Sequence, residues 1–472
     1  MKVLLINPPI FHELTSGLPK LVEDESGLYP PLGLLYIASY LKKYSNHDVK
    51  LIDAPAEKLT YPELENIIFN YRPSVVGITC TTFTMPDVLL TAKMVKKIDK
   101  DIFIAVGGRH VDIFPEETIN LPEIDFVIIG EGELTFFQLI DFLEKRTSLE
   151  SIPGLLFKKR NTLKNTGFGV LPPLDELPHP DRKLIPYAKY YTLAGRKRLM
   201  TTIITNRGCP YNCAFCVTSR QRCENRSPKN ILDEIEECHA LGIEEFYFVD
   251  STFNLNKNRV IQICEKMLER SFNINWSFRA RVKPIDLEML QQLKKTGCHL
   301  IQFGVESGTQ EILEKMNKGI SIDEVKKAFK LTQSVGISTM AYFMIGYPGE
   351  SKEHIFKSVE LAKALNPNLA VFCIFVPNPG TNVYLDAIEK GFIENDYWRE
   401  FAKNPLSDFM PPFWEKDLTR KELEETLKQT YKYFYFRPGY LFQNLIRTKS
   451  FTEFKYKIWG ALKMIRDIFF RS

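Results

Sequence analysis

Three cysteines, Cys209, Cys213 and Cys216, lie on one short segment near the middle of the chain with the spacing C-x3-C-x2-C. Thiolates are the usual protein ligands of iron–sulfur clusters. Three of them on one loop can bind three irons of a cubane cluster and leave the fourth iron open. An open iron can be chelated by the amino and carboxylate groups of S-adenosylmethionine. The spacing therefore predicts a 4Fe–4S cluster that could reduce a bound sulfonium.

Two simpler interpretations of these cysteines stay open at this point. A structural zinc site normally uses four protein ligands in two-plus-two spacing, and Cys223 could supply the fourth. The cysteines could also be grouped by chance. The aromatic Phe215, directly before the third cysteine, favours the iron–sulfur interpretation. The chain has nine cysteines, an odd number without an extracellular framework, which indicates a reducing, cytoplasmic compartment.

The length and composition of the chain limit its class. A chain of 472 residues is too long for one ordinary domain, so we expect two or three. Apolar residues make up 44% and charged residues 25%, which is a globular composition. The net charge of +4 is small and no RNA-binding module accompanies it, so nucleic acid is not an expected partner. No apolar stretch reaches the roughly 18 residues of a membrane span, and the N-terminus shows no signal-peptide cleavage pattern.

Residues 1–147 alternate short apolar strands with amphipathic helices. The expected strands are 3–7, 49–53, 75–80, 103–108 and 126–130, and the expected helices are 32–44, 61–71, 86–98 and 133–145. Strands without polar alternation, separated by helices, indicate a parallel sheet covered on both faces. The fold class is therefore α/β. Its first domain is a doubly wound, flavodoxin-like unit that would bind ligands at the carboxyl ends of its strands.

A second alternating region, 199–385, follows a segment rich in proline and glycine, 148–198, which we expect to be a linker. The expected strands of this region are 199–209, 245–250, 275–281, 299–305, 338–346 and 370–377. Strands separated by helices in this way predict a partial (β/α)6 TIM-like barrel, with its chemistry at the carboxyl ends of the strands. Residues 386–472 show only helical patterns and are the expected C-terminal helical cap.

The segment 199–380 resembles the radical S-adenosylmethionine superfamily through its C-x3-C-x-aromatic-C motif. Further residues stand at the ends of predicted strands in the order that this superfamily shows. They are Asp250 after the second strand, Arg279 and Arg281 on the third, Glu306, Ser307 and Gly308 after the fourth, and Gly346 to Glu350 after the fifth. The resemblance implies that Asp250, Arg279, Glu306, Ser307 and Gly346 contact S-adenosylmethionine. Taken singly, each could instead be a helix cap, an ion-pair partner or a turn residue.

The first domain resembles the cobalamin-binding subclass of these enzymes. The residues that carry the resemblance follow three strands: Thr79, Thr81 and Thr82, then Gly107, Gly108 and His110, then Gly130 and Glu131. Glycines let the backbone approach a bulky ligand, and threonines can hydrogen-bond its nucleotide tail. The resemblance therefore implies cobalamin at these strand ends. A nucleotide-binding or purely structural sheet is the alternative, although no Gly-x-Gly-x-x-Gly follows the first strand.

The loop after the first strand lacks Asp-x-His-x-x-Gly, the motif that supplies a histidine ligand to cobalt in many cobalamin proteins. Its absence favours a cobalt that is free of protein imidazole. His110 and His12 are the alternative ligands. For His110, a contact with the nucleotide loop or a buried hydrogen bond is the preferred interpretation.

The C-terminal segment 428–472 mixes aromatic residues with ten Lys or Arg and two acids. On a helix, one face would be shared by Trp459, Leu462, Ile465, Phe469 and Phe470. Such a helix could close the active site, or attach to an anionic membrane surface or a lipid-like substrate. The ending resembles that of enzymes grouped with the anaerobic magnesium-protoporphyrin IX monomethyl ester cyclase and the P-methylase-like group, which act on varied and in part hydrophobic substrates.

The resemblances imply an enzyme. A reduced cluster would cleave S-adenosylmethionine to a 5′-deoxyadenosyl radical, which would remove hydrogen from an unactivated carbon. Methylcobalamin would then deliver a methyl group, because a carbon radical does not readily displace the methyl group of an electrophilic sulfonium. The expected partners are a small-molecule substrate, hydrophobic or lipid-like, and an electron donor of the flavodoxin or ferredoxin type.

Three other functions remain as alternatives. The nearest is a radical cyclase or oxidative rearrangement in which cobalamin transfers no methyl group. A methylthiotransferase would need a second cluster in the first domain, where Cys80 is the sole cysteine. A non-catalytic iron–sulfur and cobalamin sensor would not need Asp250, Glu306 and Gly346.

Overall fold

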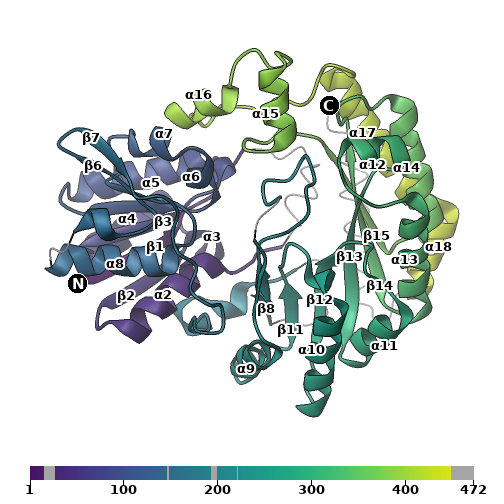
Figure 1. Cartoon of the computed structure of the whole chain (residues 1–472), viewed down its shortest axis with the longest axis horizontal. Coiled ribbons are helices and arrows are strands. Elements are labelled where there is room, and N and C mark those ends of the chain that lie inside the picture. The colour runs from purple at the N-terminus through teal and green to yellow at the C-terminus, as the bar shows by residue number, and fades with distance from the viewer. Residues whose placement is uncertain (15–26, 146–147, 193–198, 220–221, 448–472) are drawn as a thin grey trace.

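The computed structural model describes residues 1–14, 27–145, 148–192, 199–219 and 222–447. Two α/β units stand beside each other, and helices α15 (Asn382–Glu389) and α16 (Tyr397–Lys403) extend from the second unit over the first (Figure 1). Trp398 and Phe401 of α16 are buried in a hydrophobic cluster of the first unit. The C-terminal part of the chain therefore joins the two units a second time, in addition to the linker.

The first unit is built on a seven-stranded sheet with the order β2-β1-β3-β4-β5-β6-β7. The strands are β1 (Lys2–Asn7), β2 (Asp48–Asp53), β3 (Val75–Thr79), β4 (Phe103–Gly107), β5 (Phe126–Ile128), β6 (Leu155–Lys159) and β7 (Thr162–Asn165). The five strands predicted in this domain are present and pair in parallel. In this order the topological switch point lies between β1 and β3, and ligands bind in the crevice outside the carboxyl ends of the strands.

Strands β6 and β7 correct the prediction of a linker at this point. They pair antiparallel with β5 and with each other, and so complete the first sheet. Leu155, Leu156 and Phe157 are all buried, so the segment holds a short strand inside proline- and glycine-rich surroundings. The tight turn between the two strands is made by Arg160 and Asn161, both with positive φ, as two-residue hairpin turns require.

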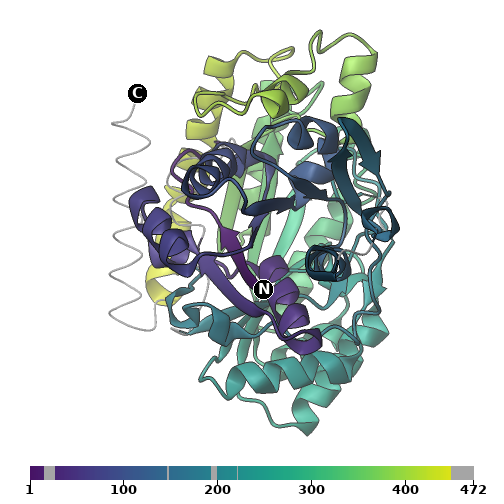
Figure 2. The same ribbon diagram turned by 90° about the vertical axis from the view of Figure 1, so that its left-hand side faces the viewer.

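Helices cover both faces of this sheet, as Figure 2 shows from the side of the first unit. They are α2 (Leu32–Tyr44), α3 (Ala54–Glu57), α4 (Tyr61–Tyr71), α5 (Met85–Ile98), α6 (Arg109–Ile113), α7 (Pro115–Ile119) and α8 (Gly132–Lys145). Because side chains alternate along a strand, Val3 and Leu5 pack in the cluster under α2 and α8, whereas Leu4 and Ile6 pack in the cluster under α4 and α5. The doubly wound architecture is confirmed.

The second unit is a six-stranded, all-parallel sheet with the order β15-β14-β13-β12-β11-β8. Its strands are β8 (Met200–Ile203), β11 (Glu245–Phe248), β12 (Asn275–Ala280), β13 (Cys298–Glu306), β14 (Ser338–Ile345) and β15 (Leu369–Ile374). The helices are α9 (Pro228–His239), α10 (Lys257–Glu269), α11 (Leu287–Lys295), α12 (Gln310–Lys315), α13 (Ile322–Ser334) and α14 (Lys352–Leu365). Phe248, Trp276 and Phe278 stack between strands and helices. The predicted partial barrel is confirmed.

The open edge of the barrel is closed by α17 (Arg420–Tyr435), which α18 (Pro438–Arg447) follows. The Tyr431 hydroxyl bonds both the N–H and the C=O of Phe372 on β15, at 3.1 and 3.0 Å, and Tyr435 does the same for Ala370. These bonds satisfy the unpaired backbone of an edge strand. The aromatic helical face predicted at 459–470 lies outside the described residues. Within the described residues, no helix is long and apolar enough to cross a membrane.

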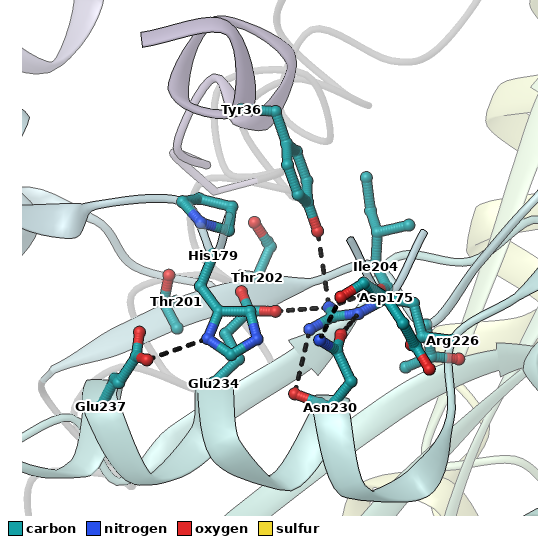
Figure 3. A network of polar contacts seen from close by, with 12 residues as sticks. Tyr36, Asp175, His179, Thr201, Thr202, Ile204, Arg226, Asn230, Glu234 and Glu237 are labelled. Atoms are coloured by element: carbon teal, nitrogen blue, oxygen red, sulfur yellow. Dashed lines mark hydrogen bonds and ion pairs between the residues drawn. The ribbon is translucent and has the colours of Figure 1, made fainter. Parts of the chain in front are cut away.

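A buried ionic network joins the linker, the first unit and the barrel (Figure 3). The carboxylate of Glu234 on α9 pairs with the guanidinium groups of Arg182 and Arg226, and the side chains of all three are 1–2% exposed. Arg226 also reaches the hydroxyl of Tyr36 on α2, at 3.4 Å. Arg182 donates to the C=O of Thr202 on β8, at 2.8 Å. One carboxylate thus compensates two buried cations that come from different parts of the chain.

We predict that Glu234→Ala destabilises the protein strongly. The substitution leaves two buried guanidinium groups without a counterion, which should lower the free energy of unfolding by about 3–5 kcal/mol. The matched control is Glu237→Ala on the same helix. The Glu237 side chain is 64% exposed and pairs with His179, so its loss should cost less than about 1 kcal/mol. Urea unfolding followed by far-UV circular dichroism measures both, and equal losses would contradict the prediction.

Candidate functional site

The three cysteines lie on a loop that leaves the barrel from a small hairpin. Strand β9 (Asn206–Arg207) pairs antiparallel with β10 (Glu224–Asn225), and residues 208–223 form the loop between them. We call this segment the cysteine loop. Gly208 has a φ of +87°, and a Cβ atom there would lie 2.0 Å from the C=O oxygen of Arg222. Only glycine fits where the two ends of the loop meet.

The middle of the cysteine loop is held by two segments from the far side of the barrel. The N–H of Ala214 donates to the C=O of Met316 at 2.9 Å, and its C=O accepts from Val383 at 3.0 Å. Asn317 donates through Nδ2 to the C=O of Asn212 at 2.8 Å. The backbone between the cysteines is therefore fixed by the end of α12 and the start of α15.

The cysteine side chains suit a cluster more closely than a single ion. Cys213 is buried, while Cys209 and Cys216 are partly exposed. No three His, Cys, Asp or Glu side chains of the described ranges converge on one metal position. A zinc site needs such convergence, whereas each thiolate of a cubane binds a different iron. The donor set therefore fits the predicted 4Fe–4S cluster.

Arg281 connects the third barrel strand to the cysteine loop. Its Nη1 donates to the Sγ of Cys213 at 3.3 Å, and its guanidinium carbon lies 3.8 Å from the ring centroid of Tyr211. Its other nitrogen donates to the C=O of Lys318. A buried cation beside a thiolate offsets part of the negative charge that a thiolate-bound cluster carries.

Asp250 performs a different task from the one expected. Its carboxylate accepts hydrogen bonds from the backbone N–H groups of Thr205, at 2.6 Å, and Asn206, at 3.1 Å, and from the Thr205 hydroxyl. The side chain is buried, and burial raises the pKa of its carboxyl group against the lowering effect of these bonds. A contact of Asp250 with S-adenosylmethionine stays a prediction. Asp250 fixes the turn that leads from β8 into the cysteine loop.

Glu306 and its neighbours divide into two groups. Glu306, at a φ of +71°, forms a 2.7 Å ion pair with Lys318, whose ammonium lies 5.6 Å from the Phe215 ring centroid of the cysteine loop. Ser307, in contrast, is fully buried. The N–H of Gly308 donates to the hydroxyl of Ser358 at 2.7 Å. The structure therefore places Glu306 beside the cysteine loop, and it places Ser307 and Gly308 against α14.

The turn after β14 depends on a buried carboxyl group. Gly346 has a φ of +77°, and its N–H donates to Oε2 of Glu350 at 2.7 Å, as does that of Tyr347 at 3.3 Å. Oε1 of Glu350 has no partner among the described residues. Burial raises the pKa of this group to about 8. Glu350 therefore holds the glycine-containing turn in its protonated form at neutral pH.

A cavity of about 780 Å³ lies between the first unit and the cysteine loop. Its lining includes Arg109, Gly130, Glu131, Phe168, Gly169, Val170, Arg207, Gly208, Val217 and Gly380. The first unit contributes the loops after β4 and β5, and the barrel contributes both ends of the cysteine loop. A ligand in the cavity would touch both units.

Glycines in the wall of the cavity allow backbone segments to pack closely. Gly130 has a φ of +82°, and a Cβ atom on Gly169 would lie 2.5 Å from the C=O oxygen of Glu131. These glycines leave bare backbone at the strand ends. No histidine is present among the described residues that line the cavity. The lining agrees with the predicted cobalamin site.

The remaining predicted cobalamin residues lie behind this surface. His110 is fully buried, with Nδ1 3.2 Å from the Thr82 hydroxyl, and burial lowers its pKa to about 3. It is a core histidine, and this buried hydrogen bond is one of the two interpretations preferred from the sequence, whereas a contact with cobalamin stays a prediction. Gly108 is required because a Cβ atom would lie 2.5 Å from the Cys80 C=O oxygen. Thr79, Thr81 and Gly107 follow the expected strands but do not line the cavity.

His12 pairs with Asp87 at 2.9 Å and also lies away from the cavity lining. Arg207, which lines the cavity, was missed by the sequence reasoning. It stands two residues before Cys209 and pairs with Glu131 and, at 2.6 Å, with Glu133. Both partners belong to the other unit, so no local pattern identifies the contact. The nearest indication in the sequence is the adjacent Gly208, because a glycine before Cys209 suggests a tight turn at this point.

We predict that Glu350 makes stability depend on pH. In the unfolded chain a glutamate titrates near 4.5, whereas the folded group keeps its proton up to a pH of about 8. The unfolded state therefore loses its proton first, and the free energy of unfolding should fall as pH rises from about 4.5 to 8, by a few kcal/mol in order of magnitude. Glu350→Gln should flatten this slope, and Glu353→Gln, at an exposed site on α14, should keep it. Urea unfolding at pH 5.5 and 8.5 measures the difference, and an unchanged slope in Glu350→Gln would refute it.

Family models match both units of the chain. Residues 21–140 match the B12 binding domain, and residues 203–362 match the radical SAM superfamily. The first match covers β2 to β5, and the loops after β4 and β5 line the cavity. The second begins at the end of β8 and includes all three cysteines.

Relatives and solved structures agree with these matches. The chain is 35% identical to an uncharacterized methyltransferase of Pyrococcus horikoshii over 98% of both chains. It is 26% identical to the anaerobic magnesium-protoporphyrin IX monomethyl ester cyclase of Rubrivivax gelatinosus, over 98% of this chain and 82% of that protein.

Two solved structures share the fold. One is the cobalamin-dependent S-adenosylmethionine radical enzyme OxsB, with a TM-score of 0.73 and 18% identity over 99% of this chain and 72% of that one. The other is the radical S-adenosylmethionine methyltransferase TsrM of Kitasatospora setae, with a TM-score of 0.67 and 20% identity over 82% and 75%. The relative that is 35% identical over nearly the whole length, together with the two family matches, shows that the chain belongs to the radical SAM superfamily, in the group that carries an N-terminal B12-binding domain.

Proposed function

We propose that this chain is a cobalamin-dependent radical S-adenosylmethionine methyltransferase that acts on an unactivated carbon of a small molecule. The position of the cavity carries the proposal, since strand ends of the first unit form one side and the cysteine loop forms the other. Gly130 and Gly208 line it together. A methyl donor held by the first unit would therefore stand close to a radical generated at the cysteine loop.

The residues of the chain would bind the cluster and position S-adenosylmethionine. Cys209, Cys213 and Cys216 would hold three irons and leave the fourth for S-adenosylmethionine. When bound, the reduced cluster supplies the electron that splits S-adenosylmethionine, and cobalamin supplies a methyl group that a carbon radical accepts. Arg281 fixes Cys213 through its hydrogen bond to Sγ. The Glu306–Lys318 pair stands next to the cysteine loop and offers one charge of each sign to the amino acid part of S-adenosylmethionine.

The further partners follow from this chemistry. The cluster must receive electrons, and we infer a donor of the flavodoxin or ferredoxin type in the cytoplasm. A hydrophobic substrate and a peripheral membrane contact of the C-terminal segment stay predictions. A radical cyclase without methyl transfer is the second candidate, because a relative similar over 98% of this chain is named as a cyclase.

The cysteine assignment predicts the outcome of four single substitutions. Cys209→Ala, Cys213→Ala and Cys216→Ala should each abolish cleavage of S-adenosylmethionine and lower bound iron and sulfide, because each removes one cluster ligand. The control is Cys223→Ala, at the far end of the same loop, which should keep both. Iron and sulfide analysis and 5′-deoxyadenosine formation after anaerobic reconstitution measure the outcome. A loss in Cys223→Ala equal to the others would favour a four-cysteine metal site instead.

Methyl transfer is tested with a metabolite extract from cells that lack the protein. The reconstituted enzyme is incubated anaerobically with reductant, methylcobalamin and S-adenosylmethionine that carries a deuterated methyl group. The added methylcobalamin carries a deuterated methyl group as well, since it is the direct methyl donor. We expect 5′-deoxyadenosine and one extract component that gains the labelled methyl group. Formation of 5′-deoxyadenosine with an unlabelled, changed component would support the cyclase. Absence of any cleavage would contradict both enzymatic proposals.

A further inference from the structure

Arg279 points into the interior of the barrel. Its neighbours on β12, Phe278 and Ala280, belong to the core between strands and helices, so Arg279 faces the opposite, concave side. The guanidinium lies 5.7 Å from the ring centroid of Tyr247 on β11, and it also interacts with the hydroxyl of Tyr342 on β14. Strands β11 and β14 flank β12 and β13, so a side chain can meet both only across the hollow of the barrel.

This arginine is exposed although it stands inside the fold. The Arg279 guanidinium interacts with the hydroxyl groups of Tyr247 and Tyr342. No carboxylate of the described residues pairs with it. The contrast with Arg281, two residues further along the strand, is direct. Arg281 is buried, and its guanidinium donates hydrogen bonds to Sγ of Cys213 and to the C=O of Lys318. A guanidinium inside a protein normally has an anionic partner, so the exposed Arg279 has capacity for one.

The groups around Arg279 are arranged for a ligand with both an anionic and an apolar part. The hydroxyls of Tyr342 and Tyr247 donate to the same oxygen of Gln302, at 2.7 and 3.4 Å, which orients the two phenol groups. Tyr29, from the loop before α2, packs against Tyr247 with ring centroids 5.6 Å apart. The first unit therefore contributes the ring of Tyr29 to the same part of the barrel interior in which Arg279 lies.

The depth of Arg279 separates it from the site of S-adenosylmethionine. Two residues along a strand span about 7 Å, so Arg279 lies about that far below the layer in which Arg281 touches Cys213. Glu306 and Lys318 already offer opposite charges at the upper layer. An anion held by Arg279 would leave several bonds between its charged end and a carbon at the level of the cysteine loop.

We propose that Arg279 binds the carboxylate or phosphate group of the substrate, so that the substrate is an organic anion whose charged end lies deep in the barrel and whose reacting carbon points toward the cysteine loop. The proposal rests on the function proposed above and adds the class of substrate. It replaces the expectation that Arg279 contacts S-adenosylmethionine.

Three small probes test the proposal on the reconstituted full-length holoenzyme: benzoate, phenylphosphonate and the neutral benzamide. Anaerobic isothermal calorimetry in the presence of S-adenosylmethionine measures their dissociation constants. We expect at least one anion to bind at least tenfold more tightly than benzamide, with affinity that falls as salt rises. Preference for benzoate would identify a carboxylate substrate, and preference for phenylphosphonate a phosphate. Binding of neither anion above the level of benzamide would overturn the proposal.

Two variants and a control assign the effect to the residue. Arg279→Gln should weaken the preferred anion at least tenfold, and Arg279→Lys should restore part of the affinity because it keeps the charge. Lys330→Gln removes one positive charge from the exposed side of α13 and should change nothing. Circular dichroism and the iron content confirm that each variant folds and holds its cluster.

The affinity for S-adenosylmethionine, measured on the same samples, decides between substrate and cofactor. We expect it to change less than threefold in Arg279→Gln. A tenfold loss of S-adenosylmethionine binding with the anion affinity unchanged would assign Arg279 to the cofactor and overturn the proposal. If S-adenosylmethionine is not cleaved but the anion binds as expected, the proposed reaction fails and the anion site stands. If cleavage occurs and no anion binds, this inference alone fails.

Discussion

Glu131, on the loop after β5, and Glu133, in the first turn of α8, share the guanidinium group of Arg207 at the entrance to the cysteine loop. Arg207 is 12% exposed, so separating it from its partners would leave charges unpaired in a poorly solvated place. The interaction therefore couples the loop that lines the cavity with the loop that carries the cysteines. The buried carboxylate of Glu234 acts in the same way deeper in the molecule, because it pairs with arginines from two different segments. The distance between a radical source and a methyl donor would be set by these charges.

The architecture could be predicted from the sequence because strands buried on both faces appear as unbroken apolar runs between amphipathic helices. The exception was β6 and β7, where the prolines and glycines around Leu155–Lys159 suggested a linker. The cysteine cluster was predictable for a related reason, since its ligands are neighbours in the chain. The roles of three other residues could not be predicted, because each depends on a partner that is distant in the chain: Arg207, Lys318 and Tyr29.

Strand ends were located correctly, whereas the directions of the side chains that follow them could not be predicted. Asp250 and His110 both stand where the resemblance placed ligand contacts, and both are turned into the protein. A buried polar group must find partners, and backbone N–H groups at the start of the cysteine loop are available to Asp250, while the Thr82 hydroxyl is available to His110. Their effect on the site is indirect: Asp250 sets where the cysteine loop begins, and His110 supports the wall behind the cavity.

The anchoring of the cysteine loop also bears on how the protein matures. The contacts that fix its backbone come from Met316, Asn317 and Val383, which a ribosome adds more than a hundred residues after Cys213. Until α12 and the start of α15 have emerged and packed, the loop lacks the partners that hold Asn212 and Ala214 in place. We therefore expect iron and sulfide to enter the finished geometry late in biogenesis, because a nascent chain presents its three thiols without these partners until the segment up to Val383 has been added.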